Sequence, residues 1–131
     1  MEKEIWRPIK GYENLYEISS RGRIKSVDRY VKGRYGNLRF QKGGIRKTTY
    51  NSRGYPAIAL CKDGKYKMFN IHRLVAEAFI PNPDNLPEIN HKDENKENNC
   101  VDNLEWCTRK YNMNYGTTQY RIHNKYWMLK Q

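Results

Sequence analysis

The stretch that decides the fold is EINHKDENKENNCVDNLEWCTRKYNMNYG, residues 88–116. It predicts a short strand ending at Asn90 and His91, followed by a loop too rich in Asn and Asp to pack a core. A second short strand is expected over Leu104–Cys107, and a helical segment carrying Asn112 follows it. This order could place one imidazole and two amide oxygens around a single point.

The composition limits the kinds of partner. The chain has 131 residues, enough for one compact domain or two small modules, and a net charge of +11. Such a surplus usually indicates a nucleic acid or, less often, an anionic membrane surface. No apolar run approaches the roughly 20 residues of a membrane span, and no signal peptide is evident. Three cysteines without a CxxC pair favour neither disulfides nor a zinc site. We expect a soluble, cytoplasmic protein without a membrane partner.

Most of the excess charge lies in one quarter of the chain. Between residues 21 and 53, eleven basic residues accompany a single acid, Asp28, so the local net charge is +10. Four aromatic residues are interleaved with them. A charge run is usually a solvated face, but this length, single sign and aromatic content favour a basic arm or hairpin lying along DNA phosphates. The expected DNA-binding residues are Arg21, Arg23, Lys25, Arg29, Lys32, Arg34, Arg39, Lys42, Arg46 and Lys47.

Two β-hairpins and one helix are expected before the organising stretch. Alternation over Leu15–Ser19 and Ile24–Tyr30, around a polar turn, predicts the first hairpin. Residues 55–71, with an Asp-Gly turn signal, predict the second. The following IHRLVAEAFIP has apolar residues at helical spacing and ends in a proline. Within these elements we interpret His72 as structural, and Trp106 in the later strand as a core residue.

The central residues resemble the HNH endonuclease motif, which sits on a ββα-metal fold. The resemblance covers roughly residues 69–115, with HRLVAEAFIPNP leading in, INHKDENKENN as the first half and DNLEWCTRKYNMNY as the second. The amino-terminal IKGYENLYEISSRGRIKS resembles the small DNA-binding module found ahead of this nuclease in intron-encoded and phage-encoded homing endonucleases. The implied fold is α+β, with an antiparallel hairpin module over 1–54, the nuclease core over 55–116 and a tail over 117–131 whose structure the sequence leaves open.

The resemblance implies a role for each matched residue. His91 corresponds to the general base that deprotonates the water attacking a DNA phosphodiester. Asn90 and Asn112 correspond to the protein ligands of one divalent metal ion, Mg²⁺ or Mn²⁺. Asn103 corresponds to the middle Asn of the catalytic motif, whose amide bridges backbone groups and holds the loop. The implied function is metal-dependent cleavage of double-stranded DNA, one strand per engagement.

Two departures from the family pattern leave alternatives open. Asn90 occupies a position that is Asp in several members, so the two amide ligands carry no formal charge and metal binding without DNA is expected to be weak. Asp93, Glu94 and Asp102 are candidates for added charge. No room is expected for a helix-turn-helix after the motif, so a specificity partner protein remains possible. The alternatives are a DNA-binding protein that has lost catalysis, a module directed at RNA, or an Asn-rich loop that is only a hydrogen-bonded turn.

Overall fold

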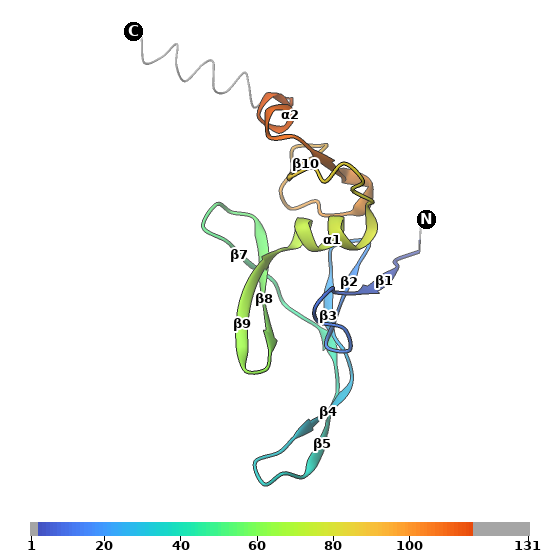
Figure 1. The fold of residues 1–131 in the computed structure, drawn as a ribbon, viewed down its shortest axis with the longest axis vertical. Coiled ribbons are helices and arrows are strands. Elements are labelled where there is room, and N and C mark those ends of the chain that lie inside the picture. The colour runs from blue at the N-terminus through green and yellow to red at the C-terminus, as the bar shows by residue number, and fades with distance from the viewer. Residues whose placement is uncertain (1–2, 117–131) are drawn as a thin grey trace.

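The computed structural model describes residues 3–116 and shows four small antiparallel sheets, three of which pack against one central helix (Figure 1). Strands and helices both contribute to the core, so the expected α+β class is confirmed. The expected tail over 117–131 lies outside the described residues.

The first sheet is built from the amino-terminal part of the chain. The predicted first hairpin is confirmed, because β2 and β3 pair antiparallel around a polar turn over Ser20–Arg23. Two further strands join at the edges, giving the order β1, β2, β3, β6. The strands of this sheet are β1 (Trp6–Pro8), β2 (Tyr16–Ser19), β3 (Ile24–Ser26) and β6 (Gly44–Ile45).

The second strand of the first hairpin ends sooner than predicted. Beyond Ser26, the N–H of Val27 donates to the Leu15 carbonyl (2.9 Å) and the carboxylate of Asp28 accepts from the N–H of Gly43 (2.6 Å). A Cβ at Gly43 would lie 1.9 Å from the Ser26 carbonyl oxygen, so this close approach requires glycine. The chain therefore leaves the first sheet here.

A separate hairpin follows, formed by β4 (Arg29–Lys32) and β5 (Leu38–Gln41). It extends away from the rest of the molecule (Figure 1). Tyr30 and Phe40 pair across its strands edge to face, with ring centroids 5.4 Å apart, and both remain more than half exposed. This element is the structured form of the expected basic arm or hairpin.

The predicted second hairpin is confirmed as β8 (Pro56–Lys62) and β9 (Lys65–Asn70), with β7 (Thr49–Tyr50) added at the edge. Its turn residues Asp63 and Gly64 both have positive φ, +53° and +75°, as a two-residue type I′ turn requires.

The helix α1 (Ile71–Phe79) joins the sheets into one core. Its buried face carries Leu74, Val75 and Ala76, and it ends where Ile80 donates back to Ala76. It packs against β2 of the first sheet, against β8 and β9, and against β10 and β11. The core contains residues from both sides of the expected 54/55 boundary: Ile18 and Ile24 before it, and Leu60, Ile89 and Leu104 after it.

The last elements form a ribbon and a short helix. The predicted strand pair is confirmed as β10 (Glu88–His91) with β11 (Leu104–Cys107), and the expected helical segment as α2 (Arg109–Asn114). A 3₁₀ turn, η1 (Val101–Asn103), precedes β11. The Thr108 hydroxyl caps α2 by accepting from the N–H of Tyr111 (3.1 Å). Among residues 3–116, no helix is long and apolar enough to cross a membrane.

Candidate active site

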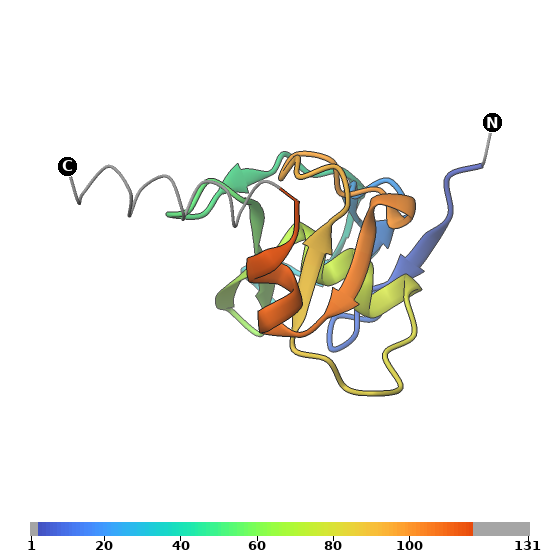
Figure 2. The same cartoon turned by 90° about the horizontal axis from the view of Figure 1, so that it is seen from above.

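The two faces of the β10–β11 ribbon contact different parts of the molecule. Side chains alternate along a strand, so Glu88 and Asn90 project to one face and Ile89 and His91 to the other. On the first face the α2 residue Asn112 contacts Glu88; on the second, Ile89 enters the core beside α1. Figure 2 shows the ribbon with both helices close to it. Base and ligand candidates therefore belong to opposite faces of one strand.

His91 is held by a buried hydrogen bond. Its Nε2 lies 2.8 Å from Oδ1 of Asn99, and the two residues are 7% and 5% exposed. An amide oxygen only accepts, so Nε2 carries the proton and the lone pair of the neutral ring is on Nδ1. Among the described residues Nδ1 of His91 has no hydrogen-bond partner, yet it is not fully enclosed. Burial lowers the pKa of His91, partly opposed by the bond to Asn99, which favours a neutral ring able to accept a proton.

His72 lies directly against the candidate base. Its ring is edge to face with His91, at a centroid distance of 5.1 Å, and tilted against Tyr55 at the same distance. Within the part of the chain that the structure describes, its Nδ1 is buried without a hydrogen-bond partner. Burial, with contributions from His91 and Arg73, lowers the pKa of His72 to about 4. The neutral His72 ring therefore packs against His91. The structural role that we predicted for His72 stays a prediction.

Asn103 ties together the loop between the two strands. Its amide Nδ2 donates to the Asp93 carboxylate (2.9 Å) and to the Asn98 carbonyl (2.8 Å), and its Oδ1 accepts from the Asp93 N–H (3.0 Å). Its own carbonyl accepts from the N–H of Lys92 (2.8 Å). These bonds fix where the chain leaves β10 after His91. Asn103 acts on the loop's geometry in this arrangement.

Asn90 and Asn112 are each oriented by a carboxylate. The Asn90 Nδ2 donates to Glu105 (3.0 Å) across the ribbon, and the Asn112 Nδ2 donates to Glu88 (3.0 Å) from α2. With its nitrogen so directed, each amide presents its Oδ1 to the opposite side. Amide and carboxylate oxygens are the donors that Mg²⁺ and Mn²⁺ prefer, so this set fits such an ion. Among residues 3–116, no cluster of three or more His, Cys, Asp or Glu residues could hold a metal instead.

Trp106 connects the ribbon to the end of α1. Its indole N–H donates to the Ile80 carbonyl (2.9 Å), and the Arg73 guanidinium lies 5.5 Å from the centroid of its ring. The side chain is partly buried against the core. The structural role of Trp106 stays a prediction, and these contacts are the ones on which it rests.

The ten expected DNA-binding residues fall into two groups. In the first, Arg23 forms an ion pair with Glu4, Lys25 lies 3.3 Å from the Glu17 carboxylate, and Arg29 contacts the Leu15 carbonyl. Arg21 is exposed in the β2–β3 turn beside them. The second group is exposed on or just after the projecting hairpin and consists of Lys32, Arg34, Arg39, Lys42, Arg46 and Lys47.

Three residues of the site were not identified from the sequence. Asn99 is one of several Asn residues in a polar loop, and no local pattern distinguishes it from Asn95 or Asn98. Glu88 and Glu105 contact the candidate ligands, whereas Asp93, Glu94 and Asp102 had been the expected sources of charge. Strand alternation could have indicated Glu88, since it lies two residues before Asn90 on the same face.

The chain matches two family models in succession. Residues 4–61 match the NUMOD4 motif and residues 69–114 match an HNH endonuclease model. An uncharacterized HNH endonuclease of Acanthamoeba polyphaga mimivirus is 41% identical over 113 residues, which cover 86% of this chain and 30% of the relative. The DNA endonuclease I-HmuI of Bacillus phage SP01 is 37% identical over 108 residues, 82% of this chain and 55% of the relative.

The fold has a solved counterpart. The structure describing DNA binding and cleavage by the HNH homing endonuclease I-HmuI matches with a TM-score of 0.66 and 34% identity, covering 95% of this chain and 60% of that one. The chain thus spans between about a third and slightly more than half of the two viral relatives.

Proposed function

We propose that this chain, which belongs to the HNH homing-type endonuclease family, cleaves double-stranded DNA with His91 as general base. One observation carries the proposal: His91 ends β10 with Nε2 bound to Asn99 and with Nδ1 unpaired among residues 3–116, and it directly follows Asn90, which lies with Asn112 on the other face of the ribbon. Such an imidazole can accept a proton from a water molecule near neutral pH.

In this proposal each residue of the site has a separate role. Nδ1 of His91 takes the proton of the attacking water, while Nε2–H stays on Asn99. Asn103 holds the loop that follows His91, so the base keeps its position relative to the ribbon. The oxygens of Asn90 and Asn112 would hold one Mg²⁺ or Mn²⁺ ion. When bound, this ion supplies Lewis-acid stabilisation of the phosphate and the departing 3′ oxygen.

The basic residues suggest how DNA reaches the site. The projecting hairpin presents Lys32, Arg34 and Arg39 on an exposed surface, where contacts to phosphates cost little desolvation. One base and one ion act on one strand at a time, so we expect a nick. Sequence selectivity then comes from this surface or from a partner protein. The substrate implies action in the cytoplasm of the cell that contains the DNA, a host cell if the protein is phage-encoded.

A supercoiled-plasmid assay tests the proposal. Wild type and His91→Ala are compared with Mg²⁺, with Mn²⁺ and with chelator, and DNA affinity is measured for both proteins. We expect open circles that require both the metal and His91, and a loss of about 10²–10⁴-fold in rate for the variant at unchanged affinity.

Other products would change or overturn this assignment. Linear DNA appearing directly would indicate two sites acting together instead of a nick. Tight plasmid binding without cleavage under any metal would favour a DNA-binding protein that has lost catalysis. Preferential binding of RNA over duplex DNA in competition would favour the RNA-directed alternative.

A further inference from the structure

The hydrogen bond between His91 and Asn99 determines which ring nitrogen of His91 carries the proton. Both partners are buried, and the acceptor is an amide oxygen 2.8 Å from Nε2. A neutral imidazole in water exchanges between two tautomers, and a hydrogen bond to one nitrogen selects which nitrogen carries the proton. Here the bond places the proton on Nε2. The lone pair is thereby kept on Nδ1, which is the ring nitrogen without a protein partner among the described residues.

Asn99 is itself held by the amino-terminal module. Gly22, in the turn between β2 and β3, has φ of +82°, and a Cβ there would lie 3.0 Å from Cβ of Asn99 and 3.1 Å from its carbonyl oxygen. Two residues earlier, the Ser20 carbonyl accepts from the N–H of Val101 (2.9 Å). The turn over Ser19–Arg23 therefore lies directly against the loop segment that carries Asn99.

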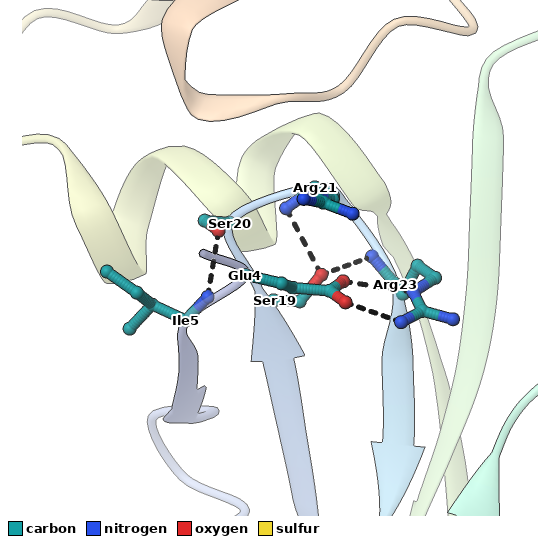
Figure 3. A network of polar contacts seen from close by, with 6 residues as sticks. All are labelled: Glu4, Ile5, Ser19, Ser20, Arg21 and Arg23. Carbon is teal, nitrogen blue, oxygen red and sulfur yellow. Dashed lines mark hydrogen bonds and ion pairs between the residues drawn. The ribbon is translucent and has the colours of Figure 1, made fainter. Parts of the chain in front are cut away.

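This turn is fixed by its own polar network (Figure 3). The fully buried Ser19 hydroxyl accepts from the N–H groups of Arg21 (3.1 Å) and Arg23 (3.0 Å). The Ser20 hydroxyl accepts from the N–H of Ile5 (3.0 Å), and the Arg23 guanidinium forms an ion pair with Glu4. Because these bonds restrain both backbone and side chains, the turn is a firm support for Asn99.

We propose that Asn99 is the positioning residue that sets the tautomer and orientation of His91, and that the Ser19–Arg23 turn holds Asn99 in place. The proposal rests on the proposed role of His91 as general base. It links the amino-terminal module to the chemistry through direct contacts, so that changes in this turn should alter cleavage without removing any residue from the site.

The tautomer can be observed directly. Long-range ¹H–¹⁵N correlation spectra of the ¹⁵N-labelled full chain, recorded well above the ordinary imidazole pKa, distinguish a protonated from an unprotonated ring nitrogen. His91→Gln identifies the signals. We expect the Nε2–H form alone in the wild type, a mixture of tautomers in Asn99→Ala, and restoration of Nε2–H in Asn99→Asp, which keeps an acceptor oxygen at this position.

Cleavage provides the second readout. In single turnovers at saturating DNA, Asn99→Ala should slow cleavage by about 10–100-fold with DNA affinity changed less than about twofold, since a mispositioned base loses part of its contribution. Asn99→Asp should recover most of the rate. A tautomer unchanged in Asn99→Ala, or a rate equal to wild type, would overturn the role of Asn99.

A matched pair of glycine variants tests whether the turn holds Asn99 in place. Gly22→Ala combines an unfavourable φ with a tight contact against Asn99, whereas Gly11→Ala has a similar φ, +87°, with nothing within 4 Å, and lies outside the β4–β5 hairpin. We expect Gly22→Ala alone to perturb the His91 nitrogen signals and slow cleavage. Equal behaviour of the two variants would overturn this half of the proposal.

The proposed function and the positioning role of Asn99 can fail separately. If the wild type never cleaves DNA, the proposed function fails, but the His91 tautomer and its dependence on Asn99 can still be read from the spectra. If cleavage requires His91 and metal while Asn99→Ala behaves as wild type in both readouts, the function stands and the positioning role is overturned.

Discussion

His72 packs its ring against His91 and Tyr55 with its Nδ1 buried. Protonating it would put a charge beside a second imidazole and near the Arg73 guanidinium, with no acceptor at Nδ1 among residues 3–116. Burial of the ring, with smaller contributions from His91 and Arg73, therefore lowers the pKa of His72 from 6.5 to about 4. At this single position, the packing that supports the site also makes the fold sensitive to acid.

The sign of that sensitivity follows from proton uptake. The unfolded chain protonates His72 near its ordinary pKa, whereas the folded chain does so only near pH 4, so stability falls as the pH is lowered through this window. The loss is up to about 3 kcal/mol. Urea unfolding measured between about pH 4 and 6.5 gives the slope of the unfolding free energy against pH. We expect a positive slope in wild type and a smaller one in His72→Phe.

Two other groups serve as controls for this slope. His91 contributes in the same direction, because burial lowers its pKa as well, so part of the slope should remain in His72→Phe. Glu4, whose pKa is lowered from 4.5 to about 2 mainly by its hydrogen bond with Arg23, contributes to the slope only below about pH 5.5, so Glu4→Gln should leave the slope above that pH unchanged. A slope unaffected by His72→Phe would contradict the assignment.

Residues of the candidate site could be picked out from the sequence only where they stand in a recognisable motif. His91, Asn90 and Asn112 stand at motif positions, and the structure brings them to one ribbon and its helix. Asn99 could not be found, because its role depends on a loop that folds back onto the imidazole and on a turn about eighty residues earlier in the chain. Contacts between distant segments leave no local signal.

The projecting β4–β5 hairpin is the element best placed to carry DNA affinity. Neither Arg34 nor Arg39 is in an ion pair among residues 3–116, while Arg23 and Lys25 on the neighbouring sheet have acidic partners. Replacing Arg34 and Arg39 by Ala should therefore weaken binding. If each contacts one phosphate, the slope of log affinity against log salt should fall in magnitude by about 2.

A control removes the same charge elsewhere. Lys10→Ala with Lys62→Ala also lowers the net charge by two, but the Lys62 ammonium already donates to the Gly11 carbonyl (2.8 Å). Fluorescence anisotropy over a salt series should show a much smaller change in slope for this pair. Equal changes in both double variants would mean that net charge, and not the hairpin, determines binding.

Element bounds were predictable where the sequence marks both a strand and the turn or loop beside it. Alternation around a polar turn predicted β2, an apolar run before an Asp-Gly turn predicted β8, and a polar, Asn-rich loop separated the predicted strands β10 and β11. The β4–β5 hairpin was expected only as a basic arm or hairpin without bounds, since its strands are exposed on both faces and alternation there carries little information.

For the whole molecule, the decisive feature is that the amino-terminal sheet and the β10–β11 ribbon share one core. Ile24 of β3 and Val75 of α1 are both fully buried, and Leu104 of the ribbon belongs to the same cluster. A boundary at residue 54 would thus separate segments of sequence whose apolar side chains pack together. Such packing favours one cooperative transition over two independent ones.

Ile24→Ala tests this coupling. Removing a large, fully buried side chain should cost about 2–5 kcal/mol, and under a shared core the loss should appear equally in the slowest-exchanging amides of β3 and of β10, although β10 lies more than sixty residues away in sequence. The control is Ile45→Ala, which removes the same atoms from a side chain that is 56% exposed. Native-state hydrogen exchange measures both strands in one experiment. Protection lost in β3 but retained in β10 would show that the amino-terminal module unfolds on its own, and the Gly22–Asn99 contact could then no longer hold His91 whenever that module opens.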